Sequence, residues 1–342
     1  NMQPFNRIIN GAMTVDQRNA GAAVSVSDGV YCLDRWWGYS SQASKYTVQQ
    51  NAGSVTPPVG FSNYLGVTVT SSVTVGGGDY FSQSQKIEAY NIADLNWGTA
   101  NAKTVTLSFW VYSSLTGTFG GGLRNGNNSY SYPFAYTILS ANTWEQKTIT
   151  VTGPTGGTWT TTNDTGVGVF FGLGVGSTYT ATAGSWQSGN YISATGATSV
   201  LGTNGATFYI TGVQLEAGSS GSSFAHENYS DTLQKCQRYY WKTFASDAAP
   251  AQAVPANNVV FVGGINGDSG LKIGSYPYPV TMRTSPTIVT YNPYAANSSW
   301  RVPASAIDVL SILTIGDSSV RFALPSTTNS CAHGHLTASA EL

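Results

Sequence analysis

Charged residues are scarce in this chain of 342 residues. Lys and Arg together number 15 and Asp and Glu number 16, which is 9% of the chain, and the formal net charge is −1. Soluble proteins are typically about 25% charged. A net charge this small removes the electrostatic attraction that draws proteins to nucleic acids or to anionic membrane surfaces. We therefore expect no nucleic-acid partner.

Long apolar runs are missing as well. No stretch approaches the roughly 18 apolar residues that a membrane-spanning helix needs, so the sequence predicts no membrane insertion. Hydrophobic residues nevertheless make up 41% of the chain and aromatic residues 12%, which supplies enough core material to exclude a disordered protein. The abundance of Gly, Ser, Thr, Asn and Tyr is typical of β-sheet with many turns and an uncharged surface.

Cysteine and histidine are rare, with three residues of each. Cys32, Cys236 and Cys331 lie far apart and form no Cys-x-x-Cys pair, so no zinc or redox motif is readable. We favour three buried free thiols over one disulfide with a leftover thiol, because free cysteine behaves as a small hydrophobe. His333 and His335 follow Cys331, and a polar turn before the last strand explains them better than a metal site assembled from three copies in a trimer. We predict no metal and no cofactor.

Alternation of apolar and polar residues predicts an all-β fold. In the segment 103–112, apolar side chains on one face alternate with polar side chains on the other, which is the pattern of a half-buried strand. The segments 144–151, 167–175 and 206–215 are further predicted strands, and Gly-rich segments between them are predicted turns. Because no helical segments separate these strands, we expect an antiparallel jelly-roll sandwich.

One short helix is predicted near residue 230, where Ser230 can cap it and Asp231 suits its first turn. We place a domain boundary there. Residues 1–229 are predicted to form the jelly-roll domain, and residues 230–342 a smaller C-terminal β domain entered through this helix.

Two long segments, 113–143 and 176–205, exceed the usual length of a connection, and we interpret them as loops that carry function. The first includes the stretch 125–136, which is rich in asparagine and tyrosine.

Several motifs together resemble one family. They are NRIINGAM at 6–13, DRWW at 34–37, SQKIEAYNIADLN at 84–96, ATFYITGVQLEAG at 206–218 and CQRYYW at 236–241. In this order they resemble bacteriophage tail-fibre and virion-surface proteins, over about residues 6–242. The resemblance implies a jelly roll like that of carbohydrate-binding modules, displayed on the virion surface as a homotrimer among other virion proteins. Some such modules hold a structural calcium, but the comparable stretches here offer only Glu216, so calcium is not supported.

Aromatic side chains near amide and hydroxyl groups are the candidate binding residues. A sugar presents an apolar face, which a ring can cover, and a rim of hydroxyls, which polar side chains can bond. Strand alternation should bury one of Trp36 and Trp37 and expose the other. The candidate residues for a host surface glycan are Trp37, Arg124, Asn127, Asn128, Tyr130, Tyr132, Trp159, Trp186, Gln187, Asn190 and Tyr191. The alternative is that the loop aromatics pack beneath their own loops or at subunit contacts.

Three functions remain open. The first is a non-enzymatic phage virion protein, a tail or surface fibre, that recognises host surface glycans. The second is a purely structural capsid-decoration or fibre protein. The third is a glycan depolymerase, which would need two neighbouring carboxylates. We expect no enzyme, because the acidic residues are scattered and form no motif; the main ones are Asp79, Glu88, Asp94, Glu145, Asp164 and Glu216.

Overall fold

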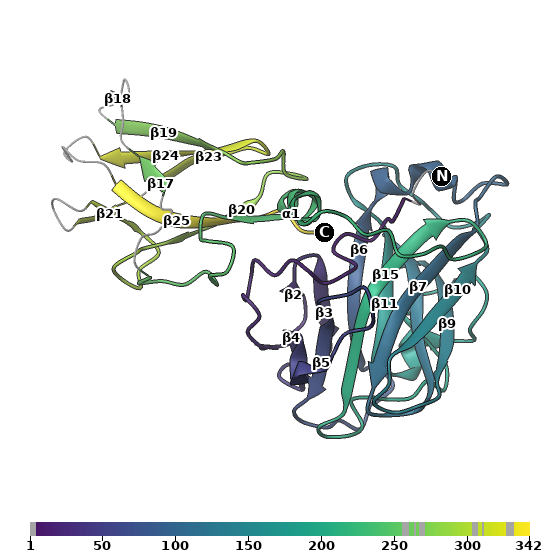
Figure 1. Ribbon diagram of the computed structural model, residues 1–342. Helices are drawn as coiled ribbons and strands as arrows, with labels where there is room; N and C mark the ends of the chain where they lie inside the picture. The colour runs from purple at the N-terminus through teal and green to yellow at the C-terminus, as the bar shows by residue number, and fades with distance from the viewer. Residues whose placement is uncertain are drawn as a thin grey trace. The chain divides into compact units, whose positions relative to one another are not determined.

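In the computed structural model of this protein the described residues are 5–254, 260–262, 265–266, 271–302, 307–309, 311–325 and 332–342. They fall into two compact units, the first comprising 5–16, 21–229 and 342, and the second 17–20 with the described part of 230–341. Strands dominate both units and pair antiparallel almost throughout, which confirms the predicted all-β class (Figure 1). Among the described residues no helix is both long and apolar enough to cross a membrane.

The first unit is a sandwich of two sheets, as predicted. Sheet A has six strands in the order β1 (Val24–Ser25), β4 (Tyr46–Gln50), β5 (Leu65–Val69), β15 (Thr207–Ala217), β7 (Val105–Ser113) and β10 (Glu145–Val151). Sheet B has seven strands in the order β13 (Gln187–Ser188), β9 (Tyr130–Ile138), β8 (Gly117–Asn125), β11 (Thr165–Val175), β6 (Tyr80–Glu88), β3 (Trp36–Ser40) and β2 (Val30–Leu33). The parallel pair β12 (Thr180–Ala181) and β14 (Ser193–Ala194) stands apart. The short 3₁₀ helices are η1 (Ala52–Ser54), η2 (Ala89–Asn91), η3 (Ala93–Leu95) and η4 (Ser177–Tyr179).

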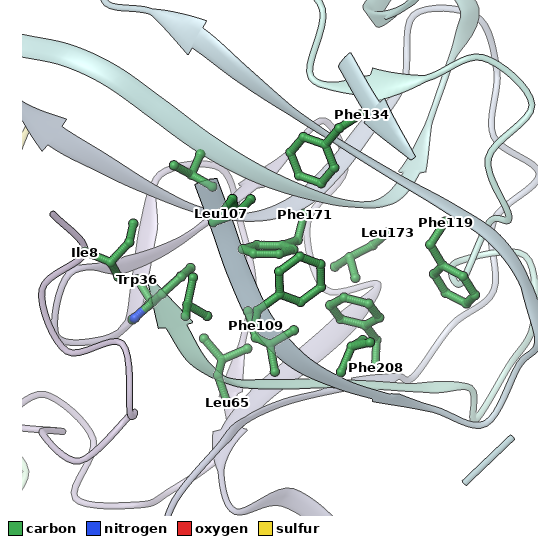
Figure 2. Packing of buried hydrophobic residues seen from close by; sticks show 14 of the residues in the cluster. Ile8, Trp36, Leu65, Leu107, Phe109, Phe119, Phe134, Phe171, Leu173 and Phe208 are labelled. Carbon is green, nitrogen blue, oxygen red and sulfur yellow. The ribbon is translucent and has the colours of Figure 1, made fainter. Parts of the chain in front are cut away.

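The core between the two sheets contains several large buried aromatic rings. Phe171 on β11 lies 5.0 Å from Phe109 on β7 and 6.2 Å from Trp36 on β3, measured between ring centroids. Figure 2 shows these three rings together in the core. Each of them alternates along its strand with residues that face away from the core, so the period of two read from the sequence sets which side of the sheet is buried.

The prediction of a loop over 113–143 is wrong, because most of this segment is the hairpin of β8 and β9. Its strand character is hidden in the sequence by two features. Glycines at 120–122 suggest a turn but lie inside β8, and Pro133 suggests a break but lies inside β9. The segment 176–205 is irregular apart from the 3₁₀ helix η4 and the two-residue strands β12, β13 and β14.

The second unit contains the helix α1 (Tyr229–Gln237) and two small sheets. One follows the order β16 (Tyr240–Lys242), β25 (Ala332–Ser339), β21 (Trp300–Val302) and β22 (Ile307–Val309), and β25 also pairs with β17 (Val260–Val262) and β20 (Thr287–Tyr291). The other follows the order β18 (Ile265–Asn266), β19 (Leu271–Pro277), β24 (Ser319–Pro325) and β23 (Ser311–Ile315). The core of the second unit includes Trp241, Met282, Trp300, Phe322 and Leu336.

The histidine tract does not form the predicted polar turn. His333 and His335 both lie within β25 and are buried, and the His335 ring stacks on Phe244 at 4.0 Å. Burial lowers the pKa of both imidazoles. Cys32 and Cys236 are buried free thiols, whereas Cys331 lies outside the described residues.

Replacing Phe171 with alanine should destabilise the protein by about 3–5 kcal/mol, because the buried ring would leave a cavity that its neighbours fill only partly. Chemical denaturation of the full chain measures the loss. Leu139→Ala is the control, because Leu139 is exposed and its truncation should change the free energy of unfolding by less than about 0.5 kcal/mol. Equal losses in the two variants would contradict the placement of Phe171 in the core.

Candidate functional site

The face of sheet B that points away from the core carries a second aromatic group. Trp37 and Tyr39 on β3 face this side, with ring centroids 5.2 Å apart. Tyr80 on β6 stacks on Tyr39 at 4.2 Å, and Phe170 on β11 meets Tyr39 edge-on at 6.1 Å. We call Trp37, Tyr39, Tyr80 and Phe170 the outer aromatic group. Trp36 and Trp37 therefore face opposite sides of the sheet, although neighbours leave Trp37 only 6% exposed.

Beside the outer aromatic group the surface is hollowed. This outer hollow has a volume of about 160 Å³. Three rings, two cations and several small polar groups line it: Trp37, Tyr39, Phe170, Lys86, Arg124, Asn125, Gly126, Asn128, Thr165 and Gly168. The strands β3, β6, β8 and β11 and the turn after β8 thus each contribute to one concave surface.

The position of the Phe170 ring depends on Gly168, two residues before it on the same face of β11. A Cβ atom at Gly168 would lie 2.6 Å from the Phe170 ring, which is closer than any real contact. The missing side chain therefore lets the ring lie over the backbone of its own strand. This arrangement places the ring among the residues that line the outer hollow.

Arg124 lies above the aromatic rings. Its guanidinium carbon is 4.4 Å from the Phe170 ring centroid and 5.6 Å from that of Tyr39, and its Nη1 donates a hydrogen bond to Asn190 Oδ1. The side chain is 5% exposed, and this burial lowers the pKa of Arg124. Lys86 is the second cation, with Nζ 4.5 Å from the Trp37 ring centroid and 2.8 Å from a backbone oxygen of Leu342, the last residue of the sequence.

The turn between β8 and β9 is held by its own asparagines. Asn125 Oδ1 accepts hydrogen bonds from the backbone N–H groups of Ser129 and Tyr130, at 2.9 and 3.0 Å. Asn128 adopts a left-handed backbone with φ of 62°, a conformation that asparagine tolerates well. The side chain of Asn128 is exposed at the outer hollow, while Asn127 lines a neighbouring hollow of about 400 Å³.

Four of the predicted aromatic residues form a cluster of their own with Trp97, which we call the end cluster. Trp186 stacks parallel to Tyr130 at 5.7 Å, and its Nε1 donates to the carbonyl oxygen of Thr152 at 2.7 Å. Its ring also meets those of Tyr132, Trp159 and Trp97 at 5.5–5.6 Å. Tyr130 and Tyr132 lie in strand β9 rather than in a loop, because the alternation that carries Phe134 and Tyr136 begins with them. The packing of Trp159 and Trp186 against the main core favours a structural role.

The remaining predicted residues hold the segment 176–205. Gln187 Nε2 donates to the carbonyl oxygen of Thr182 at 2.6 Å. The Tyr191 ring lies over Gly189, where a Cβ atom would come within 2.4 Å of it. The structure thus brings Trp37, Arg124 and Asn128 together at the outer hollow, and bonds Asn190 to Arg124.

Of the five aromatic and cationic residues that line the outer hollow, sequence reasoning missed three, namely Tyr39, Lys86 and Phe170. Two of them had a signal in the sequence. Tyr39 stands two positions after Trp37, so it shares the outward face of the same strand. Phe170 is the single bulky residue among alternating glycines on the outward face of β11. Lys86 had none, because its role depends on which face of β6 meets the core.

Several acidic residues have structural partners. Asp94 forms two hydrogen bonds of 2.8 Å with the buried Arg7 guanidinium, which holds the pKa of Asp94 below its usual value. Glu145 lies 2.6 Å from Lys147 Nζ, and Glu216 accepts bonds from Ser222. No group of three or more potential metal-ligating side chains occurs within the described ranges.

No protein-family model and no curated protein matches this chain. Among solved structures, the enzymatically active domain of tailspike protein 4 from bacteriophage CBA120 is 14% identical with a TM-score of 0.34, and the match covers 62% of this chain and 21% of that chain. A family 11 carbohydrate-binding module from Clostridium thermocellum, in complex with a mixed-linked tetrasaccharide, is 14% identical with a TM-score of 0.27, covering 60% and 98%. The cellulose-binding domain of a Cellulomonas fimi glucanase is 14% identical with a TM-score of 0.24, covering 54% and 90%. The chain therefore spans about a fifth of the tailspike, and likenesses this weak carry no argument about function.

Replacing Trp186 with alanine should lower the free energy of unfolding by about 2 kcal/mol, because the half-buried ring contacts four other aromatic rings. Thermal and chemical denaturation measure the loss, with Tyr90→Ala as the control at an exposed ring. If the Trp186 variant keeps its stability but no longer binds host cells, the structural role is contradicted and Trp186 contacts the sugar.

Proposed function

We propose that this chain is a non-enzymatic carbohydrate-binding protein whose outer hollow receives a sugar of a host surface glycan. The observation that carries the proposal is the outer hollow itself, where three aromatic rings meet cationic and amide side chains on the outward face of sheet B. Binding sites of this kind combine an apolar floor with a few placed polar groups.

The chemistry of the outer hollow suits a sugar ring. The apolar face of a sugar can cover the half-buried ring of Tyr39, while its hydroxyl groups bond Asn128 and the two cations. Pockets for drug-sized ligands measure roughly 300–1,000 Å³. The outer hollow, at about 160 Å³, is smaller and suits one sugar unit with the rest of the glycan outside.

The location that we propose is the surface of a phage particle, in a tail or capsid fibre. The resemblance of the motifs from NRIINGAM to CQRYYW to virion-surface proteins supports this part of the proposal. Single sugar sites bind weakly, because each hydroxyl bond replaces a bond to water and contributes only about 0.5–1.5 kcal/mol. Many copies on one particle would raise the avidity by about 10²–10⁴, which makes a small site sufficient for attachment.

We further propose that the chain assembles as a homotrimer with other virion proteins as neighbours. Strand β23 supports self-association, because it is the last strand of its sheet and exposes apolar side chains. Ile312 and Leu313 are 38% and 43% exposed. This observation also supports the second candidate function, a fibre protein with a purely structural role, since an apolar strand edge is suited to contact between subunits.

Binding of the purified full chain to a glycan array tests the carbohydrate function. The wild type should bind a subset of glycans, and Tyr39→Ala should lower the affinity by about 10-fold because the sugar loses a stacking surface. Tyr90→Ala is the control, an exposed ring in the same unit. Melting temperatures of both variants show that they are folded. Absence of any bound glycan, or unchanged affinity in Tyr39→Ala, would contradict this site.

Light scattering tests the assembly. We expect a trimer for the wild type at micromolar concentration, and a shift to monomer when Ile312 and Leu313 are both replaced by lysine, because charge on a buried subunit contact is costly. Val289→Lys adds charge at another exposed apolar position of the same unit and should leave the trimer intact. A monomeric wild type would contradict the homotrimer.

A further inference from the structure

Arg124 is a buried cation without a carboxylate partner among the described residues. It is 5% exposed, and its side-chain partners are neutral groups, the amide oxygen of Asn190 and the side chain of Tyr39. Aromatic rings of Tyr39 and Phe170 lie beneath the guanidinium. Buried charges in proteins are normally paired, because removal from water costs several kcal/mol that only a counter-charge and good hydrogen bonds offset.

The outer hollow is lined by two cations. Lys86 lines it beside Arg124 and also bonds a backbone oxygen of Leu342, and the lining includes no acidic residue. Glu88 lies two residues further along β6 but is buried and does not line the hollow, and Asp164 lines the neighbouring one. Of the 15 cations in this chain of 342 residues, two therefore line one small hollow that no carboxylate side chain lines.

We propose that the outer hollow selects acidic sugars, with Arg124 pairing the carboxylate of a uronic-acid type residue. This inference rests on the proposed carbohydrate function and names its ligand class. A carboxylate is planar, and the guanidinium offers its N–H donors in a matching planar fork. Lys86 is a second cation at the same hollow, and the half-buried ring of Tyr39 lies where the ring of the same sugar can stack.

A purely structural role for Arg124 is the alternative, since its bond to Asn190 connects β8 with the segment 176–205. The two roles differ in their effect on stability. If Arg124 serves to bind an anion, its charge has no counter-charge while no ligand is bound. Replacing it with leucine should then leave the melting temperature unchanged or raise it. A structural arginine should lower the melting temperature when it is replaced.

Thermal-shift and calorimetric titrations of the full chain test the proposal, with glucuronate, galacturonate, glucose, galactose and inorganic phosphate as probes. We expect the uronates to raise the melting temperature and the neutral parents to do so much less. Arg124→Leu should lower the uronate affinity by about 10- to 100-fold, the loss expected for a charge-assisted hydrogen-bonded pair. Arg321→Leu, at an exposed arginine in the second unit, is the control and should have no effect.

The outcomes separate this inference from the function on which it rests. If neutral sugars bind as well as uronates and Tyr39→Ala removes both, the carbohydrate function stands and the acidic selectivity is wrong. A shift with phosphate alone, or uronate binding that persists in Arg124→Leu, also overturns the selectivity. Binding of no sugar overturns both. If Arg124→Leu does not fold, Arg124→Lys keeps the charge but loses the fork, and it should still weaken uronate binding.

Discussion

The close approach between the segment 176–205 and the outer face of sheet B determines the form of the candidate site. Gly120 on β8 and Gly172 on β11 have no side chains where Ser193 lies, and Cβ atoms there would come within 2.3 and 2.7 Å of its Oγ. The segment can therefore lie directly on the sheet and exclude water from that part of the face. Further along β11 the outward residue is Phe170, and there the face forms the outer hollow.

The same segment also supplies part of the electrostatics of the site. Asn190 belongs to it and fixes one nitrogen of Arg124, which leaves the rest of the guanidinium fork above the aromatic rings. A charge held in this way costs the folded state some stability, because its neighbours are rings and amides rather than carboxylates. Few residues of this chain are charged, and the buried charge of Arg124 lowers the stability of the fold. This cost favours a role for Arg124 in binding a ligand.

The fold was predictable because alternation is a local property of the sequence. The alternation within residues 103–112 and within residues 206–215 is enough to predict a strand and its buried face. Both segments are long strands of sheet A in the structure. The hairpin of β8 and β9 was not predictable in the same way. Gly120 and Gly122 are explained by residues 191–194 lying against them, a contact between segments some seventy residues apart that no local pattern contains.

The candidate site was predictable only in part for a related reason. Trp37, Arg124 and Asn128 were found by residue type, but type alone did not separate rings that cover a surface from rings that fill a gap. Trp186 has the surroundings of a binding residue in the sequence, yet in the structure its half-buried ring packs against Tyr130 and other rings. That distinction depends on tertiary packing.

Two neighbouring residues of β11 face opposite sides of sheet B: Phe171 packs in the core, and Phe170 faces the outer hollow. Substitutions at position 170 can therefore change what the hollow accommodates while the sandwich keeps its packing. Position 39 can also change in this way, because Tyr39 faces outward. Its neighbour Gly38 faces inward and cannot change, because a Cβ atom there would lie 2.3 Å from the Val26 side chain. Substitutions on this one face of the sheet can therefore change ligand binding during evolution while every intermediate sequence still folds.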